Sequence, residues 1–296
     1  MSDLVSGPSV PGGCGPASTR AKNTEPQADD ASAIEVLEGL GPVRRRPGMY
    51  IGGTDEAALH HLAAEILDNS MDEAVAGHAT TIDVRLDTEN RLTIRDNGRG
   101  IPVDPHPRFH DRSALEVILT TLHAGGKFSG KAYATSGGLH GVGSSVVNAL
   151  SSHMDVEIAR ERVLWRQSYA RGKPVSPLEQ VGTAPNRRGT QISFQPDPEI
   201  FGTQLFAPAR LFRLCRSKAF LFRGVTIRWS CDPALIRTGD ETPAEAVLHF
   251  PGGLADSLAD ELGTNPPLLT PFWAGEAPLP AAADGSENGK VEWAVA

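Results

Sequence analysis

The strongest periodic pattern in the chain lies between Asp55 and Gly77, where apolar residues recur at steps of three and four. This is the period of an α-helix, and it predicts one long helix with a buried apolar face. The apolar positions are Leu59, Leu62, Ala63, Ile66, Leu67, Met71 and Ala74. At about 100° per residue, four polar residues fall within roughly one third of the circumference on the other side. They are Glu65, Asp68, Asn69 and Asp72. The predicted helix therefore has one core face and one acidic face that carries an amide.

Alternation of apolar and polar residues elsewhere predicts β-strands. These strands are expected at 81–86, 91–95, 156–160, 163–168, 191–194 and 226–229. Helical patterns appear near 33–37, 114–123, 141–150 and 207–220, and a turn-rich basic segment covers 43–52. Because helices and strands interleave along the chain, the predicted fold class is α+β.

Three regions differ in composition. Residues 1–30 have almost no large apolar side chains, which predicts a disordered leader. The periodic patterns fill a predicted domain over residues 31–235. They weaken after about Asp232. A second domain is expected to begin near Phe250, and residues 245–296 would be the first, incomplete part of it. The glycine-rich stretch between Asn97 and Gly143 predicts long loops, which often carry binding residues.

Composition excludes several function classes. Lys and Arg number 28 against 36 Asp and Glu, a formal charge of −8, so we do not expect the surface of this chain to wrap DNA. Three scattered cysteines, Cys14, Cys215 and Cys231, suggest neither a disulfide framework nor a zinc site. No run of about 18 apolar residues and no export signal is apparent. We therefore expect a cytoplasmic protein that does not enter the membrane.

Two motifs place candidate chemistry on these elements. The first is the acidic face of the predicted helix at 55–77, although such a face, taken alone, is most often a solvated surface. The second motif, Asp96-Asn97-Gly98-Arg99-Gly100-Ile101-Pro102, directly follows a predicted strand. A carboxylate there can accept a hydrogen bond from the exocyclic amine of adenine, while glycines let the backbone approach a flat ring. An ordinary turn remains the alternative interpretation of this motif.

A third motif is rich in glycine and leads into a predicted helix. It comprises Leu122–Phe128, with Lys127, and Ser136–Gly143. Glycines before a helix N-terminus leave free N–H groups that suit a phosphate. The spacing matches neither the Walker A loop nor the dinucleotide fingerprint GxGxxG. A fourth element, Arg188-Gly189-Thr190, enters a strand, and the Thr190 hydroxyl is expected to join the hydrogen bonds around Asp96.

These four elements, in this order, resemble the GHKL ATPase superfamily. The resemblance implies the Bergerat-type fold of that superfamily, a two-layer α/β sandwich. Within it, Arg44–Gly52, Asp68–Ala74, Leu122–Phe128 and Ser136–Gly143 are similar to the B subunits of bacterial type II DNA topoisomerases. Two further segments, 41–46 and 218–225, look more like topoisomerase IV than DNA gyrase. Asn97 departs from the pattern, because a second Asp is common there, and so does the long leader.

The resemblance implies a role for each matching residue. Glu65 would be the general base that activates water, with His61 orienting it, and Asn69 would be the Mg²⁺ ligand. Adenine would be bound by Asp96, Asp72, Arg99, Gly100, Ile101, Pro102 and Thr190. The phosphates would be held by Lys127, Leu139, His140, Gly141, Val142 and Gly143. Tyr133 would lie on the ribose or lid side, and Arg160 near the mouth of the pocket. Tyr50 is expected to pack rather than react.

The resemblance also implies partners and a mechanism. The cofactors would be ATP and Mg²⁺. ATP would order the lid and drive two B subunits to dimerise around DNA, within an A2B2 heterotetramer whose A-type subunit cleaves the DNA. Duplex DNA would be contacted mainly through other domains. In the family, a phosphate-sensing lysine is contributed by the second domain, and we expect it to lie beyond Ala296, the last residue given. We therefore expect this chain to bind ATP with little turnover.

Two alternatives stay open. In the first, the chain belongs to the DNA gyrase enzyme, which introduces negative supercoils. In the second, it is a non-catalytic, ATP-gated dimerisation module. Glu65 speaks against the second, because a pure binder needs no general base.

Overall fold

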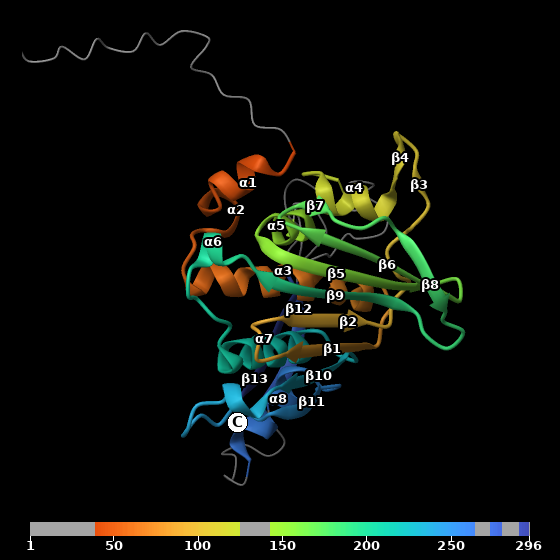
Figure 1. Cartoon of the computed structure of the whole chain (residues 1–296). Coiled ribbons are helices and arrows are strands. Elements are labelled where there is room, and N and C mark those ends of the chain that lie inside the picture. The colour runs from red at the N-terminus through yellow and green to blue at the C-terminus, as the bar shows by residue number, and fades with distance from the viewer. Residues whose placement is uncertain (1–38, 125–142, 264–272, 280–289, 296) are drawn as a thin grey trace, which may run out of the picture. The chain divides into compact units, whose positions relative to one another are not determined.

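The structure, a computed structural model, describes residues 39–124, 143–263, 273–279 and 290–295 (Figure 1). All of them belong to one unit that spans Leu37–Ala296. The predicted leader at 1–30 and the predicted short helix at 33–37 lie outside the described residues.

Within the described residues, nine strands form one mixed sheet in the order β11-β10-β1-β2-β9-β5-β6-β7, with β8 also paired to β6. The strands are β1 (Thr81–Leu86), β2 (Leu92–Asp96), β5 (Ser151–Arg160), β6 (Val163–Ala170), β7 (Lys173–Pro174), β8 (Glu179–Thr183), β9 (Gly189–Pro196), β10 (Thr226–Cys231) and β11 (Glu245–His249). Only the pairing of β1 with β10 is parallel among the pairs described for this sheet.

The described helices are α1 (Gly41–Arg45), α2 (Gly48–Ile51), α3 (Glu56–Val75), α4 (Ala114–Thr120), α5 (Gly143–Ala149), α6 (Pro198–Phe201), α7 (Pro208–Leu221) and α8 (Leu254–Leu262). Helices α3, α5 and α7 pack on one face of this sheet (Figure 1). The opposite face is polar and carries side chains such as Arg85, Thr93, Arg95 and Gln191. One apolar and one polar face is what the alternation along the strands predicts. The predicted α+β two-layer fold is confirmed.

Helix α3 lies at the centre of the helical layer. Its first turn is capped by Asp55, whose carboxylate accepts a hydrogen bond of 2.9 Å from the backbone N–H of Ala58. The apolar face of α3 contacts β1, β2 and β9. Leu59, Leu62 and Ile66 are almost completely buried there. Burial of each such side chain contributes about 1.5–3 kcal/mol, so α3 is held by packing and its polar face is left for other uses.

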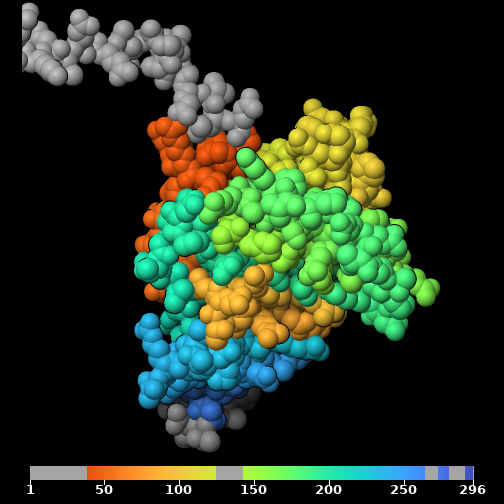
Figure 2. Space-filling model, in the orientation of Figure 1, coloured from red at the N-terminus to blue at the C-terminus, as the bar shows by residue number. Residues whose placement is uncertain are grey.

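The observed elements correct several predicted ones. The segment 43–52, predicted as turns, contains the last three residues of α1 and all of α2. The stretch predicted as loops after Asn97 includes a hairpin of β3 (Pro105–His106) and β4 (Phe109–Ser113), which protrudes from the surface (Figure 2). Four of the five residues of β4 are exposed, so no alternation marks them as a strand.

The last part of the chain adds two features that periodicity did not predict. Strand β11 joins the main sheet beside β10. Beyond it, α8 contacts β13 (Lys290–Val295), which pairs with β12 (Trp273–Pro278). Among the described residues, no helix combines the length and the apolar character that a membrane crossing requires.

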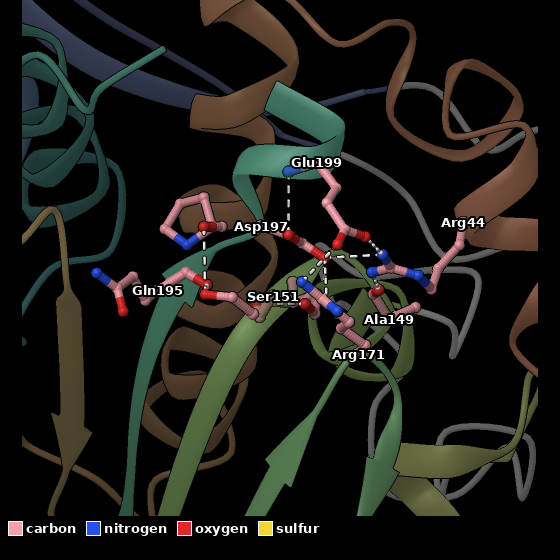
Figure 3. A network of polar contacts seen from close by, with 10 residues as sticks. Arg44, Ala149, Ser151, Arg171, Gln195, Asp197 and Glu199 are labelled. Atoms are coloured by element: carbon pink, nitrogen blue, oxygen red, sulfur yellow. Dashed lines mark hydrogen bonds and ion pairs between the residues drawn. The ribbon is translucent and has the colours of Figure 1, made fainter. Parts of the chain in front are cut away.

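A buried ionic cluster joins α1 to the far end of β9 (Figure 3). The Asp197 side chain is completely buried, and its Oδ2 accepts from Arg44 Nη2 at 2.7 Å and from Arg171 Nε at 2.9 Å. Arg44 also donates to the carbonyl oxygen of Ala149, the last residue of α5. Glu199 contacts both guanidinium groups from the exposed side. Arg44, which the sequence singled out only as part of a motif, is thus a structural residue.

Candidate functional site

A cavity of about 600 Å³ opens between the polar face of α3, helix α4, the start of α5 and strands β2 and β9. Eleven of the predicted site residues line it, although they come from five separate segments of the chain. They are Glu65, Asn69, Asp72, Asp96, Arg99, Gly100, Ile101, Pro102, Gly143, Arg160 and Thr190. Apolar side chains form much of the remaining wall, from Ile66, Ile94, Val117, Ile118 and Ile192. The cavity therefore combines apolar walls with a few polar groups, as ligand sites commonly do.

Asp96 is a buried acidic residue in the lining of the cavity. It is the last residue of β2, and only 6% of it is exposed. Its Oδ1 accepts hydrogen bonds from the backbone N–H groups of Gly98, at 2.8 Å, and Thr190, at 3.3 Å. The Ser70 hydroxyl donates to Oδ2 at 3.4 Å. All of these donors are neutral.

Burial without a positive partner has a direct electrostatic effect on Asp96. It raises the pKa of this carboxyl to about 6, and the nearby negative charge of Glu73 acts in the same direction, while the donated hydrogen bonds oppose it. At neutral pH the group is therefore ionised but poorly solvated, and it is a strong acceptor for a donor on a ligand.

Thr190 acts differently from the prediction. Its backbone N–H donates to Asp96, whereas its hydroxyl oxygen accepts from the backbone N–H of Ile101 at 3.1 Å. The residue before it, Gly189, has φ of +106°, and a side chain there would run into the backbone carbonyl of Asp96. A glycine is required at this position because β9 passes so close to the turn after β2.

The acidic face of α3 also lines the cavity. His61 Nε2 is 3.2 Å from Glu65 Oε1, one helical turn along α3. The amide nitrogen of Asn69 donates to the Ser144 hydroxyl at 2.9 Å. Gly143 lies so near Glu65 that a Cβ there would overlap with the Glu65 carboxylate. The first residues of α5 are thus fixed against Glu65 and Asn69.

The cavity lies within a segment of the chain that matches a known protein family. A family model described as "Histidine kinase-, DNA gyrase B-, and HSP90-like ATPase" matches residues 54–200, which contain every residue of the cavity named above. The B subunit of DNA topoisomerase 4 from Caulobacter vibrioides is 58% identical over 266 residues, which cover 90% of this chain and 37% of that protein. The chain belongs to this ATPase family.

Two further relatives locate the chain within the ATPase family. The B subunit of DNA gyrase from Thermotoga maritima is 53% identical over 199 residues, which cover 67% of this chain and 31% of that protein. A crystal structure of the 43K ATPase domain of Thermus thermophilus gyrase B, in complex with an aminocoumarin, superposes with a TM-score of 0.67. It is 40% identical and covers 82% of this chain and 60% of that one. The chain spans about two fifths or less of the length of the full-length topoisomerase relatives named here.

Several contacts that the GHKL ATPase fold creates in the cavity were not predicted from the sequence. Glu73 holds Arg99 through three hydrogen bonds, of which the shortest is 2.7 Å from Arg99 Nη2 to Glu73 Oε1. Arg160, expected near the mouth of the pocket, lines it, and its Nη1 donates to the carbonyl oxygen of Gly100 at 3.0 Å. Glu73 was visible on the predicted helix, but its partner lies 26 residues away. Only the three-dimensional structure shows that Arg99 is bound to a carboxylate at the rim.

The other residues singled out in the sequence fall into two groups. Six of them lie outside the described residues: Lys127, Tyr133, Leu139, His140, Gly141 and Val142. Tyr50 packs against the hydrophobic core, as expected. His61 does not line the cavity itself but contacts Glu65, which does.

Proposed function

We propose that this chain is the ATP-binding and ATP-hydrolysing part of a topoisomerase IV B subunit, which drives ATP-gated dimerisation and DNA strand passage. The observation that carries the proposal is that one cavity is lined both by a buried acceptor, Asp96, and by Glu65 with Asn69. An adenine ring would lie between the apolar walls with its amine on Asp96, and the triphosphate would then extend toward α5. Alignment with topoisomerase 4 relatives over 266 residues, against 199 for the gyrase relative, favours topoisomerase IV over gyrase.

In this proposal Glu65 is the general base, and His61 orients its carboxylate. The Asn69 amide oxygen is a hard ligand of the kind that Mg²⁺ accepts, and Mg²⁺ is usually held by few protein atoms together with phosphate oxygens and water. Among the described residues no group of three or more His, Cys, Asp or Glu side chains could hold a metal ion. The donor set thus fits a cation that arrives with a nucleotide, and the cation would offset phosphate charge during attack by water.

The remaining parts of the proposal follow from the family resemblance. Lys127 and residues 139–142 would hold the phosphates together with Gly143, with Tyr133 toward the ribose. Residues 31–235 would be the ATPase domain, and a second domain would begin within 245–296. The partners would be a second copy of the B subunit, an A-type subunit in an A2B2 assembly, and duplex DNA that is bound mainly by other domains.

Two substitutions separate binding from hydrolysis. Asp96→Asn removes the ionised acceptor and should weaken ATP binding by about 100-fold, because a charge-assisted hydrogen bond is lost and an amide N–H faces the ligand's amine. Glu65→Ala should leave ATP affinity within a few-fold but lower turnover by about 100-fold or more, since the general base is gone. Affinity is measured by calorimetry on this chain, and turnover in the complete B subunit, assembled with its A-type partner.

Glu56→Ala is a matched control, because Glu56 lies on the same helix but does not line the cavity. It should change neither quantity. Unchanged turnover after Glu65→Ala would rule out the role of Glu65 and favour a non-catalytic, ATP-gated module. Supercoiling by the complete assembly in place of decatenation would instead identify a gyrase.

A further inference from the structure

Lys218 forms an ion pair with Asp68, a residue that lines the cavity. The Nζ atom of Lys218, on α7, lies 2.5 Å from Oδ1 of Asp68, on α3. Both side chains are about four fifths buried, with 21% and 22% of their surface exposed. Asp68 lines the cavity, whereas Lys218 approaches it from the side of α7 and is not part of the lining. The pair thus joins a residue of the site to a helix outside it.

The ion pair between Lys218 and Asp68 matters for an anionic ligand because the described lining of the cavity has more carboxylates than cationic groups. Among the described lining residues, five carry carboxylates and two carry guanidinium groups. The carboxylates belong to Glu65, Asp68, Asp72, Glu73 and Asp96, and the guanidinium groups to Arg99 and Arg160. Arg99 is already matched by Glu73. A nucleoside triphosphate is a multiply charged anion, and an excess of carboxylates repels it unless cations offset them.

The position of Asp68 on α3 decides where its charge acts. Asp68 lies three residues and Asn69 four residues after Glu65, so both are neighbours of Glu65 on the helix surface. All three residues line the cavity. A carboxylate released from Lys218 would be close enough to compete with the Asn69 amide for a divalent cation. Carboxylates are strong ligands for such cations even without a nucleotide.

We propose that Lys218 is a positioning residue for the polyphosphate end of the site: it neutralises Asp68 and holds its carboxylate toward α7. This inference rests on the proposed function, and it adds a specific device to it. With Lys218 in place, a nucleoside triphosphate and its cation meet the neutral amide of Asn69 rather than a second carboxylate beside Glu65. The cation is therefore bound with the nucleotide and not ahead of it.

Replacement of Lys218 by Met should affect two ligands in opposite directions. Without divalent cations, the β,γ-imido analogue of ATP should bind about fivefold more weakly, because one negative charge near the phosphates is no longer offset. Saturating Mg²⁺ should reduce that loss to less than about twofold, since the cation takes over the screening. Mn²⁺ alone should bind several-fold more tightly, because Asp68 becomes a ligand. Adenosine, which has no phosphate, should bind equally to both proteins.

The measurements are calorimetry with the ATP analogue and with adenosine, and electron paramagnetic resonance of Mn²⁺, all on the full chain. The double variant Asp68→Asn/Lys218→Met should restore wild-type values, since it removes both charges. Arg216→Met is the matched control, because Arg216 lies on the same helix and pairs with Asp260 on α8 at 3.0 Å, away from the cavity. It should change none of the three affinities.

The outcomes separate this inference from the proposal on which it rests. Equal weakening of the ATP analogue and adenosine by Lys218→Met would show a merely structural role and overturn the inference. Unchanged affinities for the ATP analogue and for Mn²⁺ would overturn it as well. Failure of the wild-type chain to bind either adenosine or the ATP analogue would instead contradict the proposed function.

Discussion

The two ends of β9 hold two buried aspartates in opposite electrostatic states. Asp197, just after the strand, meets the guanidinium groups of Arg44 and Arg171. Asp96, beside the start of the strand, meets only neutral donors. Burial alone would raise the pKa of either carboxyl. At Asp197, the backbone N–H of Glu199 and the two guanidinium groups outweigh that effect and hold the pKa below its ordinary value, whereas at Asp96 the pKa rises to about 6.

The difference teaches how the fold separates stability from function. A buried carboxylate that is paired with cations is costly to remove, because its partners are left unpaired, and it has little left to offer a ligand. A carboxylate that is desolvated without a positive partner destabilises the fold at neutral pH, but it is held ready for a donor from outside. Asp197 is of the first kind and Asp96 of the second.

Removal of Asp197 should have the largest effect on stability. Asp197→Ala should lower the free energy of unfolding by about 3 kcal/mol, because it removes the buried partner of two arginines and the N-cap of α6. Urea unfolding at pH 7.5 measures the loss. Glu199→Ala is the control: Glu199 contacts the same two arginines but is mostly exposed, so its loss should cost less than about 1 kcal/mol. Equal losses for the two variants would mean that burial does not distinguish these carboxylates.

Replacement of Asp96 should act in the opposite direction. A folded-state pKa above the unfolded one means that ionisation of Asp96 opposes folding above about pH 6, and that this cost disappears as pH falls toward 4. Asp96→Asn should therefore stabilise the chain by about 2 kcal/mol at pH 8, and by less at pH 5. Urea unfolding of both proteins at the two pH values tests this. A variant less stable than wild type at pH 8 would contradict the assigned state of Asp96.

His60 extends the comparison to a buried base, with a smaller effect. Its Nε2 accepts from the backbone N–H of Ala207 at 3.0 Å, so the neutral ring carries its proton on Nδ1, which donates to the carbonyl oxygen of Glu56 at 2.7 Å. Burial lowers the pKa of His60. The neutral ring thus supports folding above the unfolded-state pKa near 6.5, and the support declines as pH falls below it.

The prediction for His60 concerns a difference between two pH values. From pH 7.5 to 5.5 the wild type should lose about 1 kcal/mol more stability than His60→Gln, which cannot titrate. Urea unfolding at both values measures it, with His110→Gln, at an exposed position, as the control. A His60→Gln variant with the same pH dependence as wild type would show that this ring does not contribute.

Local patterns account for the parts of the molecule that were predicted from sequence. Helix α3 has a clear helical period, and Asp96 stands in a turn motif at the end of an alternating strand, so both could be found from neighbouring residues. Asp197 could not, because Arg44 lies 153 residues away from it and no pattern connects them. Asn97, which departs from the family pattern, has a role that also needs the structure. Its side chain accepts from the backbone N–H groups of Thr80 and Thr81 and donates to the Thr80 hydroxyl.

Because α3 both packs in the core and lines the cavity, binding of a ligand in the cavity affects the stability of the whole chain. The same 20 residues carry the core on one face and line the cavity on the other. A ligand that binds there is bound only by the folded chain, so its binding free energy adds to the stability of the fold through mass action, by about 2.7 kcal/mol at a concentration 100 times its Kd. Occupancy is therefore expected to raise the melting temperature of the chain even if no turnover follows, and any compound that fills the cavity is detectable without a substrate or a partner.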